Sequence, residues 1–492
     1  MRSSLISLFT LGITCCAYAA TPALTIYNQD FAVVRDVIPL NLQAGINHVE
    51  YSGMTGDAEP DSVILRDPAG KIVWQIVEQN YRKDTASVDR MLALYEGKTI
   101  QFQMPDGKLV SGRILRAQTP PVFMQPATYY QQPPGGPLQP MIELDGQIRF
   151  GVPGVPLFPA GADHVLLKPT MDWTIRSNQK ATVDAELGYV TGGLTWKADY
   201  NVVSAEDSDR VDLIGWVTME NHSGKSFPEA QIALMAGDVN KTTARRMGGQ
   251  ILAQAAMLGT GSEQPVVTEK PFDDYHLYRL GNKTTLLDSE TKQVEFVHAN
   301  GISTKRIYLY DGTDLSRYIN MYTGYDQIRN ISEYGTAVNP KVWVMREFVN
   351  SAANHLGIAL PKGRLRFYRQ DTGGELEFTG ENEIDHTPKD ETIRVYTGAA
   401  FDIVGNRKQT AYRVDGNFQN RQADESFEIS VRNRKAEPVA VIVREHMYRS
   451  ANWTISVESD QHVQRDSHTI EYPINVAANS EKIVKYSVHY TW

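Results

Sequence analysis

The stretch GLTWKADYNV, residues 193–202, decides the fold class of this chain. Apolar side chains occupy every second position and polar ones fill the gaps, with Leu194, Trp196, Ala198, Tyr200 and Val202 alternating with Thr195, Lys197, Asp199 and Asn201. This alternation is typical of a β-strand with one buried face and one solvated face. Trp196 and Tyr200 share the apolar face, so we expect both rings in a core between sheets. A ligand-binding platform is the alternative, and it would more often set aromatic rings among polar neighbours.

Similar short runs recur along the chain and are separated by turn residues. Examples are FAVVRDV (31–37), KIVWQIV (71–77), KTIQFQM (98–104) and KLVSGRIL (108–115), and PDG between the last two predicts a hairpin turn. We therefore predict an all-β fold: a small N-terminal β domain over residues 22–118, followed by a larger region of sandwich-like sheets over 141–492.

Two segments interrupt the strand pattern. Residues 119–140 are rich in Pro, Gln and Gly, which predicts a linker or long loop. Tyr129 and Tyr130 lie in it and could stack on a sugar or peptide, although covering a neighbouring surface is the simpler role. Residues 242–262 are rich in Ala, Met and Gly and predict a partly helical or disordered insert. A partner-binding amphipathic helix is the alternative there.

The N-terminus has the three parts of a secretory signal peptide. Arg2 supplies a positive charge, residues 5–16 form a short apolar run, and Ala17-Tyr18-Ala19 fits a cleavage site. We therefore expect residues 1–19 to direct export to the periplasm or cell surface. The only cysteines, Cys15 and Cys16, lie inside this segment, so the mature chain would have no disulfide, thiol nucleophile or cysteine metal site.

Charge and hydropathy limit the partners. The formal net charge is −9, and no run of basic residues occurs along the sequence. This argues against nucleic acid or anionic lipid as a partner. After the signal segment no stretch approaches the ~20 apolar residues of a membrane span, so no transmembrane helix is expected in the mature chain.

Three asparagines end predicted strands immediately before polar turns: Asn221 in VTMENHSG, Asn350 in REFVNSAAN and Asn433 in ISVRNRKAE. Asn favours turn entry because its side chain bonds nearby backbone. We predict three similar hairpins. The middle one is ambiguous, since its apolar residues also fit helical spacing: Met345, Phe348, Val349, Ala352 and Leu356.

The chain ends in EKIVKYSVHYTW, residues 481–492. Unbroken alternation predicts a docked strand whose apolar face points inward: Val484, Tyr486, Val488, Tyr490 and Trp492. Lys485, Ser487 and His489 would then face outward. Recruitment of a partner by edge pairing is the competing interpretation.

One segment, DHTPKDE at residues 385–391, is dense in titratable groups. Its weak candidates for acid–base catalysis are Asp385, His386, Asp390 and Glu391. A charged, capped turn leading into the strand TIRVY is the preferred interpretation, because nothing nearby supplies a nucleophile. The sequence contains no HExxH, GxSxG or phosphate-binding glycine motif, so we expect no metal and no cofactor.

Several segments together resemble a known family: residues 193–202, 220–239, 356–404 and 486–492. They are similar to a bacterial family of secreted domains of unknown function, whose better-named relatives are the mucoidy-inhibitor-A-like proteins. The resemblance covers about residues 165–492 and implies a β fold and export, with no catalytic residues to carry over. The chain lacks the long coiled-coil segment of those relatives, so a role in restraining polysaccharide production is not implied.

These observations predict an exported, non-catalytic binding or structural protein of the bacterial cell envelope, with an unidentified envelope component or protein as its partner. The alternative is a hydrolase acting on envelope carbohydrate through acids such as Asp385, Asp390 and Glu391, since carboxylate pairs of glycosidases leave no short motif.

Overall fold

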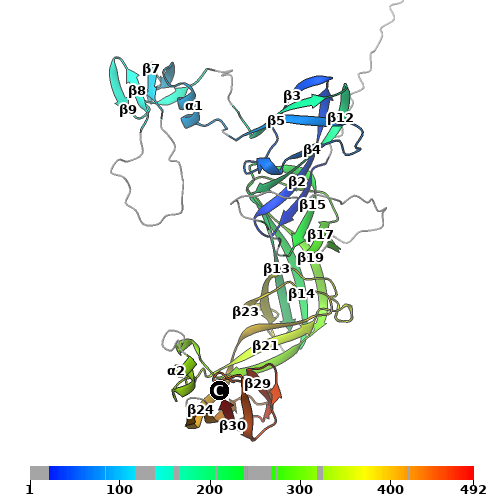
Figure 1. Ribbon diagram of the computed structural model, residues 1–492, viewed down its shortest axis with the longest axis vertical. Coiled ribbons are helices and arrows are strands. Elements are labelled where there is room, and N and C mark those ends of the chain that lie inside the picture. The colour runs from blue at the N-terminus through cyan, green and yellow to red at the C-terminus, as the bar shows by residue number, and fades with distance from the viewer. Residues whose placement is uncertain are drawn as a thin grey trace, which may run out of the picture. The chain divides into compact units, whose positions relative to one another are not determined.

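The computed structural model describes residues 21–83, 85–117, 139–159, 166–205, 208–237, 239, 241, 267–272, 275–318, 325–417 and 420–492. Strands dominate it (Figure 1), and the all-β prediction is confirmed. The predicted signal segment (1–19), all but the end of the Pro-rich segment (119–140) and the predicted insert (242–262) lie outside the described residues.

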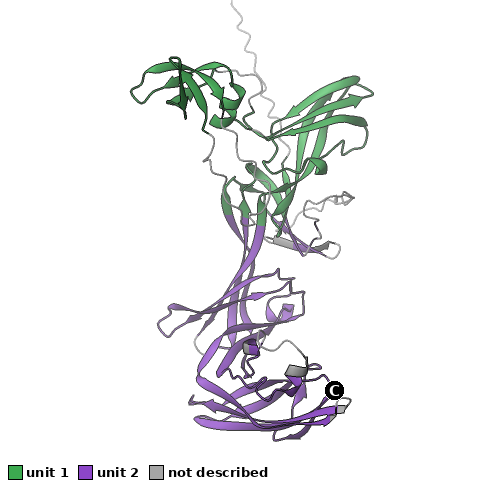
Figure 2. Cartoon of the chain, turned by 60° about the vertical axis from the view of Figure 1, so that its left-hand side comes forward, with its two compact units in different colours: residues 1–195, 220–233, 282–291 green, residues 196–219, 234–281, 292–492 purple. Residues whose placement is uncertain are grey.

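The chain divides into two compact units, which Figure 2 colours green and purple. Unit 1 comprises Met1–Thr195, Glu220–Ala233 and Asn282–Thr291, and unit 2 comprises Trp196–Met219, Leu234–Gly281 and Lys292–Trp492. Four of the five boundaries fall within long strands, which are β13 (Leu194–Ala205), β14 (Arg210–Asn221), β15 (Phe227–Ala236) and β19 (Glu290–Ser303). Each unit is therefore assembled from segments that are distant in sequence.

Unit 1 contains three groups of strands. In the first, β15 is followed by β1 (Ala23–Tyr27), β2 (Phe31–Leu42), β12 (Ala181–Gly192) and β4 (Ile64–Arg66), and β18 (Thr284–Leu286) pairs with β15. The second has the order β3 (Gly45–Tyr51), β11 (Thr170–Ser177) and β5 (Trp74–Arg82). A short 3-10 helix, η1, spans Pro60–Ser62.

The third group in unit 1 has its own small core. Its order is β10 (Val155–Leu157), β6 (Thr99–Gln103), β7 (Leu109–Arg116), β8 (Met141–Leu144) and β9 (Gln147–Phe150), with helix α1 (Val88–Leu94). The buried side chains are Leu92, Ile100, Phe102, Ile114, Ala117 and Ile142. Strands β6 and β7 are antiparallel, and Gly107 has φ +84, which glycine adopts readily. The hairpin predicted at PDG is thereby confirmed.

Unit 2 contains two large sheets and a hairpin. The hairpin pairs β16 (Val267–Phe272) with β17 (Tyr275–Leu280). The first sheet has the order β19, β14, β13, β22 (Gly363–Gln370) and β23 (Leu376–Ile384). The second sheet has the order β27 (Trp453–Glu458), β30 (Ser480–Thr491), β25 (Asn420–Asn433), β24 (Thr392–Asn417), β21 (Lys341–Val349), β20 (Lys305–Asp311), β26 (Val439–His446), β29 (Thr469–Val476) and β28 (Val463–Gln464).

Short helical elements accompany the second sheet: η2 (Ser316–Tyr318), α2 (Tyr325–Asn330) and η3 (Ala352–Asn354). The segment with ambiguous periodicity is thus a strand, β21, that is followed by a single 3-10 turn. Pairing with β20 and β24 on either side decides this, because a strand between two others satisfies its backbone groups along both edges.

The opening stretch forms β13, and its apolar face is buried as predicted. The indole Nε1 of Trp196 donates to the Met235 carbonyl at 3.1 Å, and the Tyr200 hydroxyl donates to the Pro361 carbonyl at 2.6 Å. These bonds satisfy the polar ends of two buried rings. Both aromatic side chains are therefore core residues and not a ligand platform.

The C-terminal strand β30 is docked as predicted. It pairs with β25 along its whole length, and Val484, Tyr486, Val488 and Tyr490 are buried. Trp492 is partly buried against the same core. The alternating positions Lys485, Ser487 and His489 are exposed or partly exposed. Strand β30 lies between β25, which pairs with its whole length, and β27, which pairs with residues 486–490, so the terminal part of β30 is not open to edge pairing with a partner.

The three asparagine turns share one design, but the prediction that they close hairpins is wrong. The strands that follow Asn221 and Asn350 belong to other sheets, and β25 and β26 on either side of Asn433 are not neighbours in theirs, because the chain leaves each turn towards a different set of pairing partners. Each side-chain amide donates to a carbonyl of its own turn at 2.7–2.8 Å, the acceptors being Lys225 for Asn221, Ile358 for Asn350 and Glu437 for Asn433. Each side-chain oxygen also accepts a backbone N–H, from Ser223, Gly357 and Lys435 respectively. All three asparagines are fully buried, so these bonds satisfy groups that water cannot reach.

Candidate anion-binding pocket

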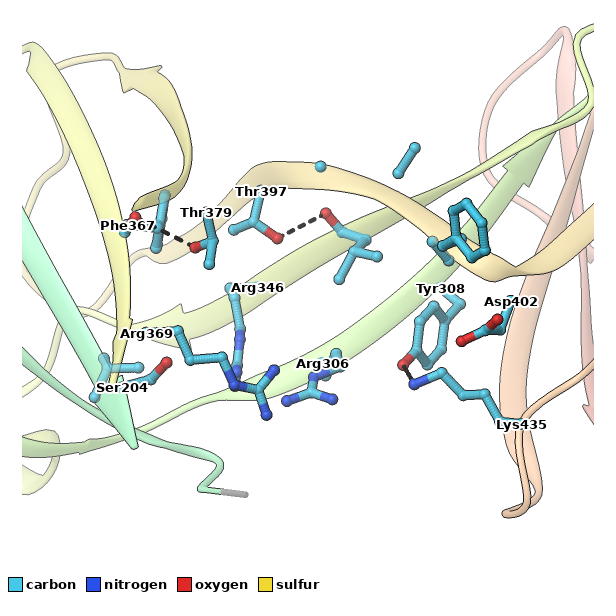
Figure 3. A pocket seen from close by; sticks show the side chains of 16 residues that line it. Ser204, Arg306, Tyr308, Arg346, Phe367, Arg369, Thr379, Thr397, Asp402 and Lys435 are labelled. Atoms are coloured by element: carbon cyan, nitrogen blue, oxygen red, sulfur yellow. Dashed lines mark hydrogen bonds between the residues drawn. The ribbon is translucent and has the colours of Figure 1, made fainter. Parts of the chain in front are cut away.

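A cavity of about 290 Å³ lies in unit 2 between its two large sheets (Figure 3). One wall comes from β13, β14, β22 and β23, and the other from β20, β21 and β24. Lys435, in the turn between β25 and β26, completes the lining.

Three arginines line this pocket: Arg306 on β20, Arg346 on β21 and Arg369 on β22. Arg306 and Arg346 are directly opposite each other in the antiparallel β20–β21 pair. Like charges at directly opposed positions destabilise a sheet. The arrangement therefore has an electrostatic cost.

Arg346 is the most deeply placed of the three, with its side chain only 9 % exposed. Its Nη1 donates to Thr304 Oγ1 at 2.9 Å and lies 3.5 Å from a carboxylate oxygen of Asp209. Asp209 is 74 % exposed, so solvent weakens this ion pair. Burial lowers the pKa of Arg346, and the positive charges of Arg306 and Arg369 lower it further.

Arg306 differs from its neighbour because, over the part of the chain that the structure describes, its guanidinium has no hydrogen-bond acceptor and no ion-pair partner. A guanidinium presents several N–H donors in a planar fork that suits carboxylate and phosphate oxygens. Arg306 can therefore offer these donors to a ligand in the cavity.

The fourth cation, Lys435, is held by one of the asparagine turns. Its backbone N–H donates to the Asn433 side chain at 2.9 Å, and its Nζ donates to the Tyr308 hydroxyl at 3.0 Å. Tyr308 itself is buried and lines the cavity. The buried asparagine thus fixes the backbone from which a charged side chain reaches the pocket.

Hydroxyl groups and one carboxylate make up the rest of the polar lining. Thr379 donates to the Phe367 carbonyl at 3.2 Å, and Thr397 donates to the Val344 carbonyl at 3.1 Å. Asp402 is the one acidic residue among the described lining residues, which include no histidine, cysteine or glutamate. The pocket suits the binding of an anion, and its described lining has no imidazole base that could activate a hydroxyl nucleophile.

One aromatic side chain of the lining is almost fully exposed to water. Phe401 lines the cavity and is 93 % exposed, the highest value among the large exposed apolar side chains of the described residues. It lies on β24, next to Asp402. Isolated exposed apolar side chains are common, but such an extreme exposure beside a polar cavity offers a contact surface to a ligand.

The four predicted acid–base candidates lie elsewhere, at the turn before β24. Asp385 is 94 % exposed, with Lys362 at 3.7 Å, while Asp390 and Glu391 are also exposed. His386 Nδ1 accepts the backbone N–H of Lys362 at 3.1 Å. None of the four lines the cavity described above or a second one below.

This turn is fastened by its backbone to the asparagine turn at residue 350. The Asp390 N–H donates to the Asn350 carbonyl at 2.7 Å, and the Asn350 N–H donates to the Glu391 carbonyl at 2.9 Å. Asp390 has φ +66, a left-handed conformation that Asp tolerates better than most residues. These bonds are those of a capped turn that leads into β24.

A second cavity of about 440 Å³ lies at the end of β20 and is lined by Trp343, Asn339, Thr313, Asp311 and His446 among others. His446 Nε2 lies 3.0 Å from an oxygen of Asp311. The hydrogen bond to Asp311 raises the pKa of His446, and partial burial opposes this rise. Within the described ranges, no group of three or more His, Cys, Asp or Glu side chains could hold a metal ion.

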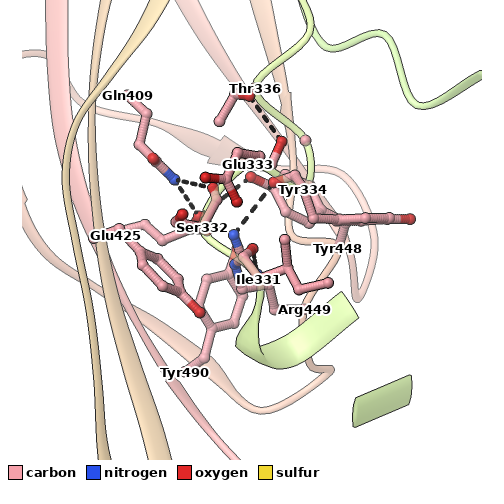
Figure 4. A network of polar contacts seen from close by, with 12 residues as sticks. Ile331, Ser332, Glu333, Tyr334, Thr336, Gln409, Glu425, Tyr448, Arg449 and Tyr490 are labelled. Atoms are coloured by element: carbon pink, nitrogen blue, oxygen red, sulfur yellow. Dashed lines mark hydrogen bonds and ion pairs between the residues drawn. The ribbon is translucent and has the colours of Figure 1, made fainter. Parts of the chain in front are cut away.

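Two buried ion pairs fix the segment before β21 to the second sheet. Arg449 donates to Glu425 at 2.7 Å and also to the carbonyls of Ile331 and Tyr334 (Figure 4). Arg407 Nε lies 2.9 Å from Glu445, and both side chains are fully buried. Burial opposes the charged form of each arginine, but the adjacent carboxylate outweighs it, so the pKa of Arg407 and of Arg449 lies above the usual value.

Sequence reasoning missed the arginine-lined pocket, yet a signal was present. Each of the three arginines is in phase with buried residues of its strand: Arg306 with Tyr308, Arg346 with Val342 and Phe348, and Arg369 with Leu365 and Phe367. A charged side chain at an inward position of a strand is unusual, because an unpaired buried charge is costly. Such positions would have marked each arginine as unusual, although the sequence does not show that the three meet in one pocket.

The protein is all-β, and a cavity lined by four cationic side chains lies between two sheets of one unit. The chain belongs to the family described as a domain of unknown function, DUF4139, which matches residues 185–492 and so includes every residue that lines the pocket. The expected membership of a family of unknown function is thereby confirmed, while the link to mucoidy-inhibitor-A-like proteins stays a prediction.

No curated protein and no solved structure matches the chain. None of the described helices is long and apolar enough to cross a membrane.

Proposed function

We propose that this chain is an exported, non-catalytic binding protein of the bacterial cell envelope that holds an anionic envelope component in its arginine-lined pocket. The observation that carries the proposal is the direct opposition of Arg306 and Arg346, with Arg369 close enough to lower the pKa of Arg346 further. Export rests on the sequence pattern of residues 1–19.

An anion among the arginines would reverse the unfavourable electrostatics of this lining. Without a ligand, the guanidinium groups repel one another in a partly desolvated space, where charge interactions are stronger than in water. A bound carboxylate, sulfate or phosphate accepts their N–H groups and neutralises the charge. Binding energy is thus available at the site, while its described lining offers no histidine, cysteine or glutamate for catalysis.

Calorimetry and thermal melts of the purified mature chain with millimolar sodium sulfate, at constant ionic strength, test anion binding. We expect the melting temperature to rise, because a ligand that binds only the folded state stabilises it. Arg306→Gln should weaken sulfate binding by about tenfold or more, since hydrogen bonds to charged groups contribute ~1.5–3 kcal/mol.

The matched control is Arg364→Gln, which removes an arginine of β22 that is half-exposed, lies near Glu381 and does not line the pocket. A general salting-out effect of sulfate would stabilise both variants equally. Equal sulfate affinity in the two variants would contradict the proposal.

The proposed location is tested by fractionating cells that express the full chain and sequencing the N-terminus of the exported form. We expect it to begin at residue 20, while an intact chain confined to the cytoplasm would contradict export. Turnover of a glycan panel that Asp390→Asn abolishes would support the hydrolase alternative instead.

A further inference from the structure

The charge on the pocket lining indicates which kind of anion it takes. Four cationic side chains and one carboxylate are among the described lining residues, an excess of three positive charges: Arg306, Arg346, Arg369 and Lys435 against Asp402. Asp209 and Glu437 pair with Arg346 and Lys435 from outside the lining, but both acids are largely exposed, so solvent weakens their compensation. A single carboxylate would therefore leave part of the charge of the lining uncompensated. A phosphate monoester carries about −1.5 to −2 at pH 7 and has three strong acceptor oxygens.

The donors are arranged for such a group. Figure 3 shows the guanidinium groups of Arg306, Arg346 and Arg369 gathered at one end of the cavity. Planar guanidinium groups bind phosphate oxygens in pairs, and three of them can engage three oxygens at once. Arg346 is already anchored by Thr304, so its orientation does not depend on the ligand.

The other end of the cavity has a different character. Lys435, Tyr308 and Asp402 lie there in Figure 3, and Lys435 donates to the Tyr308 hydroxyl. Phe401 is the residue before Asp402, lines the same cavity and is almost fully exposed. An aromatic face beside hydroxyl and carboxylate groups contacts an organic body that is itself both apolar and hydroxylated, such as a sugar ring.

We infer that the pocket binds a phosphate monoester, with the phosphoryl group among the three arginines and a small organic body against Phe401. This inference rests on the proposed anion-binding function and specifies its ligand class. The cavity, about 290 Å³, is at the lower end of the range for ligand sites, which favours a body of one ring. A phosphorylated sugar and a lipid headgroup share this chemistry, and the net charge of −9 favours the soluble source because it repels anionic membranes.

Calorimetry on the full mature chain with four probes tests the inference: inorganic phosphate, glucose 1-phosphate, glucuronate, and phosphatidylcholine vesicles with and without phosphatidic acid. We expect glucose 1-phosphate to bind about tenfold more tightly than inorganic phosphate, and glucuronate to bind most weakly of the soluble probes. Vesicles with phosphatidic acid should give no more heat of binding than vesicles of phosphatidylcholine alone.

Two variants separate the parts of the site. Phe401→Ala, at an exposed position where folding should not suffer, is expected to remove the advantage of glucose 1-phosphate and to leave the affinity for inorganic phosphate unchanged. Arg306→Gln is expected to weaken both phosphate probes by about tenfold or more, as hydrogen bonds to a charged group predict.

The outcomes distinguish this inference from the function on which it rests. Glucuronate binding as tightly as glucose 1-phosphate would overturn the phosphate assignment while leaving an anion-binding protein. An unchanged preference in Phe401→Ala would overturn the placement of the organic body. Vesicle binding that Arg306→Gln removes would support the phosphate chemistry and assign it to a lipid. Absence of binding to every anion, sulfate included, would overturn the proposed function itself.

Discussion

Substitution of Glu445 by Gln should destabilise the second sheet of unit 2 more than any exposed substitution. The Glu445 carboxylate lies 2.9 Å and 3.1 Å from Nε of Arg407 and accepts the Tyr486 hydroxyl at 2.6 Å. Arg407 also donates to the Gly335 carbonyl at 2.7 Å and lies over the Phe427 ring at 3.8 Å. Both charged side chains are fully buried, so Gln at residue 445 leaves the guanidinium without a compensating charge.

The magnitude follows from this burial. Removing one partner of a buried ion pair costs about 3–5 kcal/mol, because the remaining charge stays desolvated. Replacing both partners by apolar residues, as in Arg407→Met with Glu445→Leu, removes both charges at once. That double variant still leaves the Tyr486 hydroxyl and the Gly335 carbonyl without their partners, at about 1–3 kcal/mol each if neither finds another. We expect it to be more stable than Glu445→Gln alone.

Hydrogen exchange of peptides from β25 and β30, measured in increasing urea, gives the free energy of opening for this sheet alone. A local measurement is needed because a chain with two compact units need not unfold in one step. The control is Asp415→Asn, which removes an exposed pair with Arg413 and should leave the exchange of these peptides unchanged. A loss below about 1 kcal/mol in Glu445→Gln, or a double variant less stable than the single one, would refute the reasoning.

Three further predictions concern other parts of the chain. Arg306→Gln should raise the free energy of unfolding of the ligand-free protein by about 0.2–1 kcal/mol, because it removes the like charge opposite Arg346; a lower melting temperature would contradict this. His446 has a folded-state pKa above its usual 6.5 owing to Asp311, so its stabilisation is complete below pH ~6.5 and is lost as the pH rises through the folded-state pKa. Urea titrations should therefore show the stability difference between wild type and His446→Gln shrinking from pH 5.5 towards pH 9, and a growing difference would be inconsistent with the pair. Deletion of residues 484–492 should give an insoluble or protease-sensitive protein, since losing even one buried aromatic side chain costs about 3–5 kcal/mol; an unchanged melting temperature would count against a core role.

The sequence by itself determined that the fold is all-β and, for the strands with clear alternation, which face points inward; the ambiguous segment that forms β21 was decided by pairing. Alternation predicted that Trp196 and Tyr200 lie in the core and that the apolar face of β30 points inward. Such predictions need no knowledge of the neighbouring strands, because side chains in any strand alternate between its two faces. The asparagine turns were predictable for a similar reason. Asn221, Asn350 and Asn433 each bond backbone groups within eight residues, which is a local property. Their further bonds to distant carbonyls, those of Leu287, Pro388 and Ala477, were not predictable from the sequence.

Only the tertiary structure decided which strands are neighbours, and the pocket depends on that. The sequence shows no basic run, yet the antiparallel register of β20 with β21 sets Arg306 opposite Arg346. The parallel pairing of β13 with β22 puts Ser204 beside Arg369. Both residues belong to the wall of the pocket that faces β20 and β21. Which strands pair depends on how whole faces pack and on how backbone groups are hydrogen-bonded. These contributions to the free energy come from the entire fold, so they leave no local pattern in the sequence. At residues 385–391 the opposite happened, since the sequence shows a dense local group of titratable residues that suggests a site. Only the tertiary structure shows that these residues lie outside both cavities and that their backbone is bonded to the turn at Asn350.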